Sequence, residues 1–201
     1  MSHLPDPIAQ FAAWFEEANR CQAIEQANAA CLSTLDRDGF PDGRMVLLKQ
    51  FDARGFVFYT NLNSVKGKAL AAHPKAALTF HWDPLKRQVR IQGTTSLVSP
   101  QEADAYWVTR PRLAKIGAWA SLQSERLDHN RTFIKRLAEA ALKFGTGAVP
   151  RPPHWTGIRV IPSKIEFWRS RRGRLHERFL YTKQVLVPRP EDQWQIQRLY
   201  P

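Results

Sequence analysis

The residues best suited to chemistry lie near the C-terminal end of the chain, in the stretch 165–179. Arg174, His176 and Arg178 stand two residues apart there, after a turn-forming run at 170–173. Because strand side chains alternate between faces, a hairpin would place two guanidinium groups and one imidazole in a single row. Guanidinium offers a planar fork to phosphate oxygens, and imidazole exchanges protons near neutral pH. The row predicts a site for a phosphorylated ligand, the alternative being a charged edge strand that discourages aggregation.

A second cationic position lies at the start of a short predicted helix, Val65–Ala72. Ser64 is placed to cap this helix, and Lys66 and Lys68 fall in its first turns. A helix N-terminus offers free N–H groups and a partial positive charge, so lysines beside it favour an anion. An ordinary surface connector is the alternative interpretation.

Two further pairs of residues could share a ligand. Arg44 and Lys49 belong to a predicted strand, 44–51, but strict alternation sends their side chains to opposite faces. Tyr106 and Arg110 lie four residues apart on one side of a predicted helix. The second pair either packs together at the surface or reaches a ligand together.

Composition limits the class of protein. The chain has 201 residues, with 30 Lys and Arg against 18 Asp and Glu, a net charge of +12. The excess attracts anions, but no block of like charges forms a tail, so we do not expect nucleic acid as the partner. Cys21 and Cys31 are too few for a disulfide framework and lack zinc-site spacing, which favours a reduced, cytoplasmic location without a metal. No basic leader or run of ~18 apolar residues occurs, so we expect neither secretion nor membrane insertion.

The hydrophobic periodicity predicts short strands that do not alternate regularly with helices. This excludes a doubly wound sheet and favours a mainly β (α+β) fold, an antiparallel, Greek-key-like barrel with flanking helices, in one domain spanning residues 1–201. Asp6 and Pro7 begin an N-terminal helix over about 6–28. The other predicted helices span 65–72, 99–110 and 125–144, and the predicted strands span 30–35, 44–51, 55–60, 76–82, 88–97, 157–162, the hairpin 165–179, and 194–200.

Several common catalytic motifs are absent from the sequence. There is no Gly-x-Gly-x-x-Gly, no Walker-type loop, no Gly-x-Ser-x-Gly and no His-Glu-x-x-His. Dinucleotide dehydrogenases, nucleotide hydrolases, serine esterases and zinc hydrolases therefore lose support. The candidate functional residues that remain are aromatic and cationic side chains on several strands. A flat phosphorylated cofactor would need side chains of both kinds.

Together these residues resemble the pyridoxamine 5′-phosphate oxidase family. The resemblance runs in order from about Asp6 to the end of the chain, and its last motif lies in a C-terminal region of about 157–201. It is carried by Arg44–Lys49, Phe58–Asn61, Ser64 with Lys66, Arg87–Val89, Tyr106 with Arg110 and Arg112, Ile116–Trp119, Gln123 and Ser124, and Trp168 with Arg174–Arg178.

The resemblance implies an FMN-binding split barrel that forms a homodimer, with active sites at the subunit interface. Members oxidise pyridoxine or pyridoxamine 5′-phosphate to pyridoxal 5′-phosphate, passing a hydride to FMN and then electrons to O2, with release of H2O2. By position, FMN would be held by Arg44, Met45, Val46, Leu47, Leu48, Lys49, Tyr59, Thr60, Ser64, Lys66, Gln88, Gln123, Ser124, Trp168 and Arg178.

The resemblance also implies a substrate site formed by Lys49, Tyr106, Arg110, Arg174 and His176. The first three would meet the substrate phosphate. Arg174 and His176 would lie over the reacting carbon and orient it against the flavin, so positioning is their expected catalytic contribution.

Two positions depart from the family pattern. Val65 stands where an arginine beside the FMN phosphate is common, and Ala114 stands where a serine contacts the substrate phosphate.

Three alternative functions remain open for this sequence. They are a related flavin oxidase such as those of phenazine biosynthesis, a non-catalytic binder of FMN or pyridoxal phosphate, and a basic nucleic-acid-binding barrel.

Overall fold

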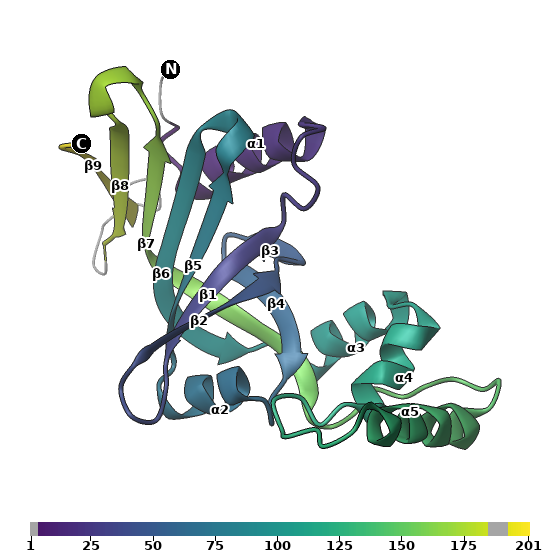
Figure 1. The fold of residues 1–201 in the computed structure, drawn as a ribbon. Helices are drawn as coiled ribbons and strands as arrows, with labels where there is room; N and C mark the ends of the chain where they lie inside the picture. The colour runs from purple at the N-terminus through teal and green to yellow at the C-terminus, as the bar shows by residue number, and fades with distance from the viewer. Residues whose placement is uncertain (1–3, 185–192) are drawn as a thin grey trace.

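The structure is a computed structural model that describes residues 4–184 and 193–201. It contains an antiparallel sheet, with helices packed at its ends and side (Figure 1). The helices are α1 (Pro7–Arg20), α2 (Val65–Ala72), α3 (Pro100–Thr109), α4 (Arg112–Ala120) and α5 (Asn130–Phe144). The strands are β1 (Ala29–Leu35), β2 (Pro41–Leu47), β3 (Gln50–Asp52), β4 (Gly55–Asn61), β5 (Lys75–Trp82), β6 (Arg87–Leu97), β7 (Trp155–Arg169), β8 (Glu177–Lys183) and β9 (Trp194–Leu199).

The strand order is β2-β1-β5-β6-β7-β4-β3, with β8 and β9 added beyond β7. The order is open, and its two end strands, β2 and β3, are joined in the chain by Leu48 and Lys49. Leu48 N donates to the Asn28 carbonyl at 2.8 Å, and Lys49 N donates to the Val57 carbonyl at 2.9 Å. The two edges of the sheet therefore meet at Lys49. The predicted mainly β (α+β) fold is confirmed.

Helix α1 supplies the centre of the main hydrophobic core. Asp6 caps the helix by accepting hydrogen bonds from Ile8 N and Ala9 N, as predicted. The ring of Phe11 is fully buried and lies 5.0 Å from the ring of Phe56. The helix ends at Arg20 rather than near residue 28, because its apolar stripe stops at Ala18 and the chain turns at Cys21.

The long strand β7 connects the two halves of the sheet. It pairs with β4 and β6 on either side and then continues to pair with β8. A register shift at Gln92 and Gly93 lets β6 bend across it. A Cβ atom at Gly93 would lie 1.9 Å from the Ile161 carbonyl oxygen, so only glycine allows this approach.

The predicted C-terminal hairpin is confirmed as β7 and β8, but its return strand starts later than expected. Residues 172–174 form a 3-10 turn, with Gly173 and Arg174 in left-handed backbone conformations at φ +66° and +60°. The strand begins at Glu177. The prediction that Arg174, His176 and Arg178 form one row on a strand is therefore wrong for the first two, because the turn extends past them.

Three other differences from the expected elements are found. The single strand 44–51 is divided into β2 and β3, so the parity argument that separated Arg44 from Lys49 does not apply. Helix α4 was not predicted, and α5 begins at Asn130 rather than near residue 125. The N-cap of α4 is Pro111, which has no side chain that can accept a hydrogen bond. The sequence therefore lacks the Ser, Thr, Asp or Asn that usually marks the start of a helix.

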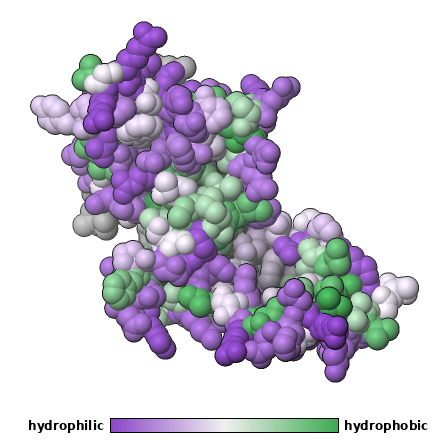
Figure 2. Space-filling view, in the orientation of Figure 1, coloured by the Kyte–Doolittle hydropathy of each residue, from purple (hydrophilic) through white to green (hydrophobic). Residues whose placement is uncertain are grey.

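Helices α3, α4 and α5 form a lobe beside the sheet (Figure 1). A small core of Trp107, Ile116, Val149 and Trp155 holds this lobe against the start of β7. In Figure 2 the lobe projects from the sheet, and the surface between them is hollowed. Across residues 4–184 and 193–201, no helix is both long and apolar enough to span a membrane.

Candidate active site

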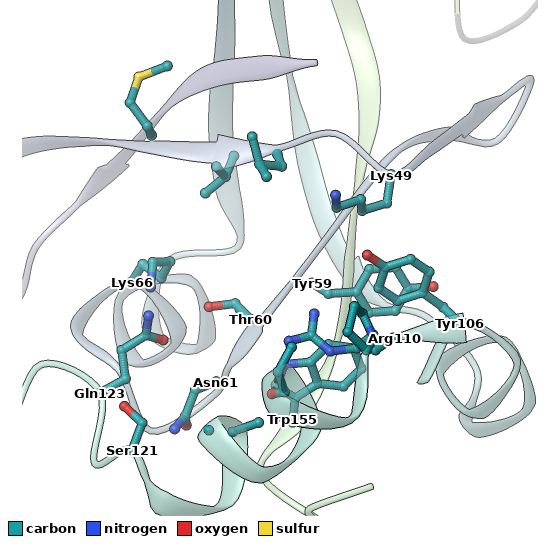
Figure 3. A pocket seen from close by; sticks show the side chains of 17 residues that line it. Lys49, Tyr59, Thr60, Asn61, Lys66, Tyr106, Arg110, Ser121, Gln123 and Trp155 are labelled. Atoms are coloured by element: carbon teal, nitrogen blue, oxygen red, sulfur yellow. Dashed lines mark hydrogen bonds between the residues drawn. The ribbon is translucent and has the colours of Figure 1, made fainter. Parts of the chain in front are cut away.

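A cavity of about 550 Å³ lies between the sheet and the lobe (Figure 3). Strand β2 and Lys49 line one wall, the end of β4 and the start of α2 line a second, and α3, α4 and β7 line the remainder. The lining residues are Met45, Val46, Leu47, Lys49, Tyr59, Thr60, Asn61, Lys66, Tyr106, Arg110, Pro111, Ala114, Gly117, Ala118, Ser121, Gln123 and Trp155.

Stacked aromatic rings form one side of the cavity. The rings of Tyr59 and Tyr106 lie 4.0 Å apart and nearly parallel, and the Trp155 ring lies 5.1 Å from that of Tyr59. A Cβ atom at Gly157 would lie 2.9 Å from Tyr59 Cε1, so the absence of a side chain there leaves room for the stack. Burial, with smaller contributions from Glu102 and Tyr106, raises the pKa of Tyr59 to about 12, which keeps the phenol neutral.

One end of the cavity is formed by Lys49, Tyr106 and Arg110 (Figure 3). The Arg110 guanidinium lies 4.8 Å from the centre of the Trp155 ring, which holds it in place. Its Nε is buried without a hydrogen-bond partner, and one NH2 group makes only a long contact of 3.4 Å to the Ala114 carbonyl. A half-buried, incompletely paired guanidinium of this kind fits an anion.

The opposite end is formed by Lys66 at the start of α2, with Gln123 beside it (Figure 3). Ser64 caps the helix by accepting from Gly67 N, and Lys66 Nζ donates to the same hydroxyl at 3.3 Å. Burial, and then the nearby charge of Arg44, lower the pKa of Lys66. Among the described lining residues there is no carboxylate, so an anionic ligand would relieve this charge.

Other predicted residues gather at the far end of β7, beside the β7–β8 turn. Gln88, Trp168 and Arg178 occupy adjacent register positions on β6, β7 and β8. The His176 ring lies 4.8 Å from that of Trp168, and Arg178 Nε donates to Glu166 at 2.8 Å. These positions form a second, separate cluster that does not line the cavity in this chain.

The structure therefore sorts the predicted site residues into two groups. The cavity group contains Met45, Val46, Leu47, Lys49, Tyr59, Thr60, Lys66, Tyr106, Arg110 and Gln123. The hairpin group contains Gln88, Trp168, Arg174, His176 and Arg178.

Four predicted residues belong to neither group. Arg44 binds Asp42 and donates to Thr34 Oγ1 at 2.6 Å, while Leu48 is buried in the main core. Ser64 is buried as the α2 cap, and Ser124 follows the cavity residue Gln123.

Six lining residues were assigned no binding role from the sequence: Asn61, Pro111, Gly117, Ala118, Ser121 and Trp155. Trp155 is opposite Asn61 in the pairing of β4 with β7, two segments far apart in the chain. No local sequence pattern reveals that pairing. The only signal is a large apolar side chain, Trp155, directly after a proline-rich loop, which indicates that it packs against another part of the chain.

Taken together, the antiparallel sheet and the cavity fit the class of proteins whose ligands are flat phosphorylated compounds. The cavity combines a stacked aromatic wall with cationic groups at both ends. Within the described ranges, no group of three or more His, Cys, Asp or Glu side chains is arranged to hold a metal ion.

Comparisons with known proteins agree with this class. Residues 15–143 match the family described as pyridoxamine 5′-phosphate oxidase, and residues 155–201 match the pyridoxine 5′-phosphate oxidase C-terminal dimerisation region. The chain belongs to the pyridoxamine 5′-phosphate oxidase family.

Two relatives are named pyridoxine/pyridoxamine 5′-phosphate oxidase. The one from Caulobacter vibrioides is 56% identical over 98% of this chain and 85% of its own length. The one from Azorhizobium caulinodans is 50% identical over 98% of this chain and 90% of its own length.

Two solved structures share the fold. PhzG from Burkholderia lata, in complex with tetrahydrophenazine-1-carboxylic acid, has a TM-score of 0.87 at 29% identity, covering 98% of this chain and 94% of that chain. A pyridoxamine 5′-phosphate oxidase-related, FMN-binding protein from Nostoc punctiforme has a TM-score of 0.76 at 19% identity over the full length of both chains. The second comparison supports the split-barrel fold alone.

Proposed function

We propose that this protein is a flavin-dependent oxidase that converts pyridoxine 5′-phosphate and pyridoxamine 5′-phosphate to pyridoxal 5′-phosphate. The observation that carries the proposal is a single cavity with an aromatic wall and two separate cationic ends, Lys66 at one and Arg110 at the other. Two phosphorylated ring compounds could lie there together, each with its phosphate at one end. The names of relatives at 50% and 56% identity support the same activity.

FMN is the proposed cofactor, and when bound it supplies the hydride acceptor that no side chain provides. Lys66 and the free N–H groups at the start of α2 would hold its phosphate. Lys66 fits this role because its lowered pKa reflects a buried cation next to Arg44, which a bound dianion would compensate. Thr60 and Gln123 would bind polar groups on the same molecule.

The substrate phosphate is proposed to bind between Lys49, Tyr106 and Arg110. The unpaired Nε of Arg110 fits this role, because a phosphate oxygen would supply the missing partner. The aromatic stack next to it excludes water from one face of the substrate ring.

We further propose a homodimer in which the hairpin group of each chain completes the cavity of its partner. This is supported by the match of residues 155–201 to a dimerisation region and by the distance of the hairpin group from the cavity in its own chain. Arg174 and His176 would orient the substrate, and Arg178 and Trp168 would contact the cofactor. Residues 1–201 are proposed to act as one domain, because β7 pairs with strands from both matched segments.

The reaction needs O2 as the final electron acceptor, with H2O2 as the second product. We propose a cytoplasmic location, consistent with the free thiols of Cys21 and Cys31.

A related oxidase acting on a phenazine precursor is the second candidate. The similarity to PhzG and the presence of Ala114 in the cavity favour it. The presence of Tyr106 and Arg110 at a phosphate-sized end of the cavity favours the phosphorylated substrate instead.

Oxygen uptake with pyridoxine and pyridoxamine 5′-phosphates, with and without added FMN, tests the proposal. We expect a yellow protein whose oxygen consumption depends on the phosphorylated substrates and rises with added FMN. The unphosphorylated alcohol and amine serve as controls, and they should be oxidised far more slowly because Arg110 would lack its partner. A yellow protein that consumes no oxygen would indicate a binder, and a colourless one that stays inactive with FMN would contradict the proposal.

A further inference from the structure

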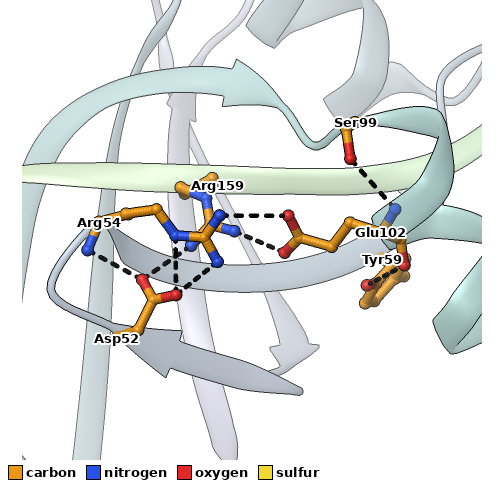
Figure 4. Close-up of polar contacts among 6 residues, drawn as sticks. All are labelled: Asp52, Arg54, Tyr59, Ser99, Glu102 and Arg159. Carbon is orange, nitrogen blue, oxygen red and sulfur yellow. Dashed lines mark hydrogen bonds and ion pairs between the residues drawn. The ribbon is translucent and has the colours of Figure 1, made fainter.

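A buried arginine outside the cavity joins α3, which carries the cavity residue Tyr106, to β3, which directly follows the cavity residue Lys49 (Figure 4). The Arg159 side chain, on β7, is only 8% exposed. Its NH1 donates to Asp52 at 3.1 Å, and its NH2 donates to Glu102 at 2.5 Å. Asp52 ends β3, and Glu102 lies in the first turn of α3. This set of Asp52, Arg159 and Glu102, called here the Arg159 bridge, therefore connects a strand to a helix through a third element.

Both carboxylates of the bridge also pair with Arg54, whose NH1 lies 3.8 Å from the Glu102 carboxylate. Arg54 donates to Asp52 through NH2 at 2.6 Å and Nε at 2.9 Å. Burial opposes ionisation of Asp52, but the hydrogen bonds from Arg54 and the charge of Arg159 outweigh it, so the pKa of Asp52 is lowered. Glu102 N donates to Ser99 Oγ at 3.1 Å, and the Glu102 carbonyl accepts from Tyr59 OH at 3.4 Å.

The bridge lies next to the residues proposed to bind the substrate phosphate. Lys49 directly precedes β3, the strand that carries Asp52. Glu102, Tyr106 and Arg110 follow one another at intervals of four, which places them along one side of α3 and its C-cap. A shift of α3 relative to β3 would therefore change the separation between Lys49 and the other two phosphate ligands.

The other cationic end of the cavity is supported independently. Lys66 is on α2, which is positioned by the Ser64 cap and by the close approach of Gly67 to Leu62. None of the contacts of the Arg159 bridge described above involves α2. The two ends can therefore be perturbed separately.

We infer that Arg159 is a positioning residue for the substrate-phosphate end of the cavity. It holds β3 and α3 at the separation at which Lys49, Tyr106 and Arg110 converge on one phosphate. Arginine suits this role because its planar fork reaches two carboxylates in different directions, which the single ammonium of lysine does not. The inference rests on the proposed function of the cavity.

The test is Arg159→Met, with kinetics measured at saturating FMN and the FMN dissociation constant measured by flavin fluorescence. Loss of the bridge should let β3 and α3 move apart and misplace the phosphate ligands, so we expect KM for pyridoxine 5′-phosphate to rise about tenfold or more. Because Arg159 itself touches no ligand, kcat should stay within about threefold. The dissociation constant for pyridoxal 5′-phosphate, measured by calorimetry, should rise in parallel with KM. FMN affinity should stay within about threefold of wild type.

Arg87→Met is the matched control. Arg87 is a second buried arginine in the same sheet, but it pairs with Glu17 of α1 at 2.8 Å and lies over Trp14. Its loss should lower Tm as the loss of Arg159 does, without changing KM. Arg159→Lys should give a KM between wild type and Arg159→Met. Arg54→Gln removes the hydrogen bonds to Asp52 and the 3.8 Å ion pair to Glu102 but keeps both Arg159 contacts, so KM should rise less than in Arg159→Met.

An unchanged KM and an unchanged pyridoxal 5′-phosphate affinity in a folded Arg159→Met protein would overturn the inference. So would a parallel loss of FMN and substrate affinity, because it would indicate a general collapse of the cavity. If Arg159→Met does not fold, Glu102→Gln and Asp52→Asn test the same connection from its two ends. Failure of the proposed function is distinguishable, because wild type itself would then neither bind nor oxidise pyridoxine 5′-phosphate.

Discussion

The cavity group and the hairpin group differ in how the chain supports them. Tyr59, Tyr106 and Trp155 stack on one another, and Arg110 is held over the last of these rings. By contrast, Arg174 and His176, which are proposed to orient the substrate, precede β8, and Arg174 lies in a 3-10 turn with φ +60°. The cavity group is thus assembled by packing inside one chain, whereas the turn has little of its own chain to pack against.

This difference indicates which half of the site is preformed. Rigid aromatic packing fixes the cavity before any ligand arrives, so its contribution to binding needs little reordering. In the proposed dimer, the exposed Arg174 would become fixed against the partner chain, whereas His176 already packs on Trp168 of its own chain. The four predictions below test this division.

The largest effect is expected from disabling the two groups in separate chains. Arg110→Ala should lower kcat/KM about 100-fold, because a charge-assisted contact to phosphate is worth about 1.5–3 kcal/mol. When this variant is unfolded and refolded together with Arg174→Ala, hybrid dimers would contain one intact site. The oxygen-uptake rate of the mixture should then recover to about one quarter of wild type.

Refolding each variant alone is the control for this mixing experiment. If the mixture shows only the average of the two variants, each chain builds its site from its own residues, and the proposed sharing between subunits is wrong.

Within the hairpin group, the turn and the strand should have different effects. Arg174→Ala should lower kcat/KM at least about tenfold without loss of flavin, because Arg174 is proposed to orient only the substrate. Arg178→Ala should instead weaken FMN retention, since this side chain is fixed on β8 by Glu166. Flavin content after gel filtration, measured beside steady-state kinetics, checks both; exchanged phenotypes would refute the assignment.

The cofactor end of the cavity offers a gain of function. Val65 is the first residue of α2, is 49% exposed, and stands where the family resemblance places an arginine. Val65→Arg should tighten FMN binding about tenfold, the lower limit for one added charge-assisted contact. Val65→Met, which adds length without charge, is the control in the same fluorescence titration, and equal affinities for the two variants would contradict the expectation.

The smallest effect concerns stability without FMN. Because the pKa of Lys66 is lowered, the unfolded chain binds more protons than the folded chain at alkaline pH, between that lowered pKa and the ordinary lysine pKa of 10.5. The free energy of unfolding contributed by Lys66 should therefore rise with pH in this window. Lys66→Met should raise Tm of the flavin-free protein at neutral pH by a few degrees and remove this rise.

Denaturant titrations of wild type and Lys66→Met, from neutral pH to the pKa of lysine, measure the effect. Saturating FMN should reverse the order of stability, because only wild type binds the phosphate well. If Lys66→Met lowered Tm in both states, Lys66 would have a structural role instead.

Sequence reasoning succeeded where the determining contacts are local. The capping residues Asp6, Ser64 and Ser99 each accept the hydrogen bonds expected at a helix start. It failed at α4, where Pro111 caps without a side-chain bond, and at the turn before β8, where Arg174 adopts a conformation that usually marks glycine.

The residues of the site could be predicted from the sequence, but their separation into a cavity group and a hairpin group could not. The family resemblance identified ten of the residues that line the cavity, and it did not include Trp155. Which residues share a cavity depends on pairings such as Asn61 with Trp155, which join distant segments. No periodicity within one segment contains that information.

The length of β7 has a consequence for how such a protein can change. Trp155 contacts the cavity at one end of this strand, and Trp168 contacts His176 near the other, a span of roughly 40 Å at about 3.3 Å per residue. Deleting two residues would keep every side chain on its original face but would withdraw the turn by about 7 Å, beyond the range of any hydrogen bond. In the proposed dimer, the length of β7 would therefore set the distance between the cavity of one chain and the hairpin group that it presents to its partner. Loops elsewhere should accept insertions that this strand does not.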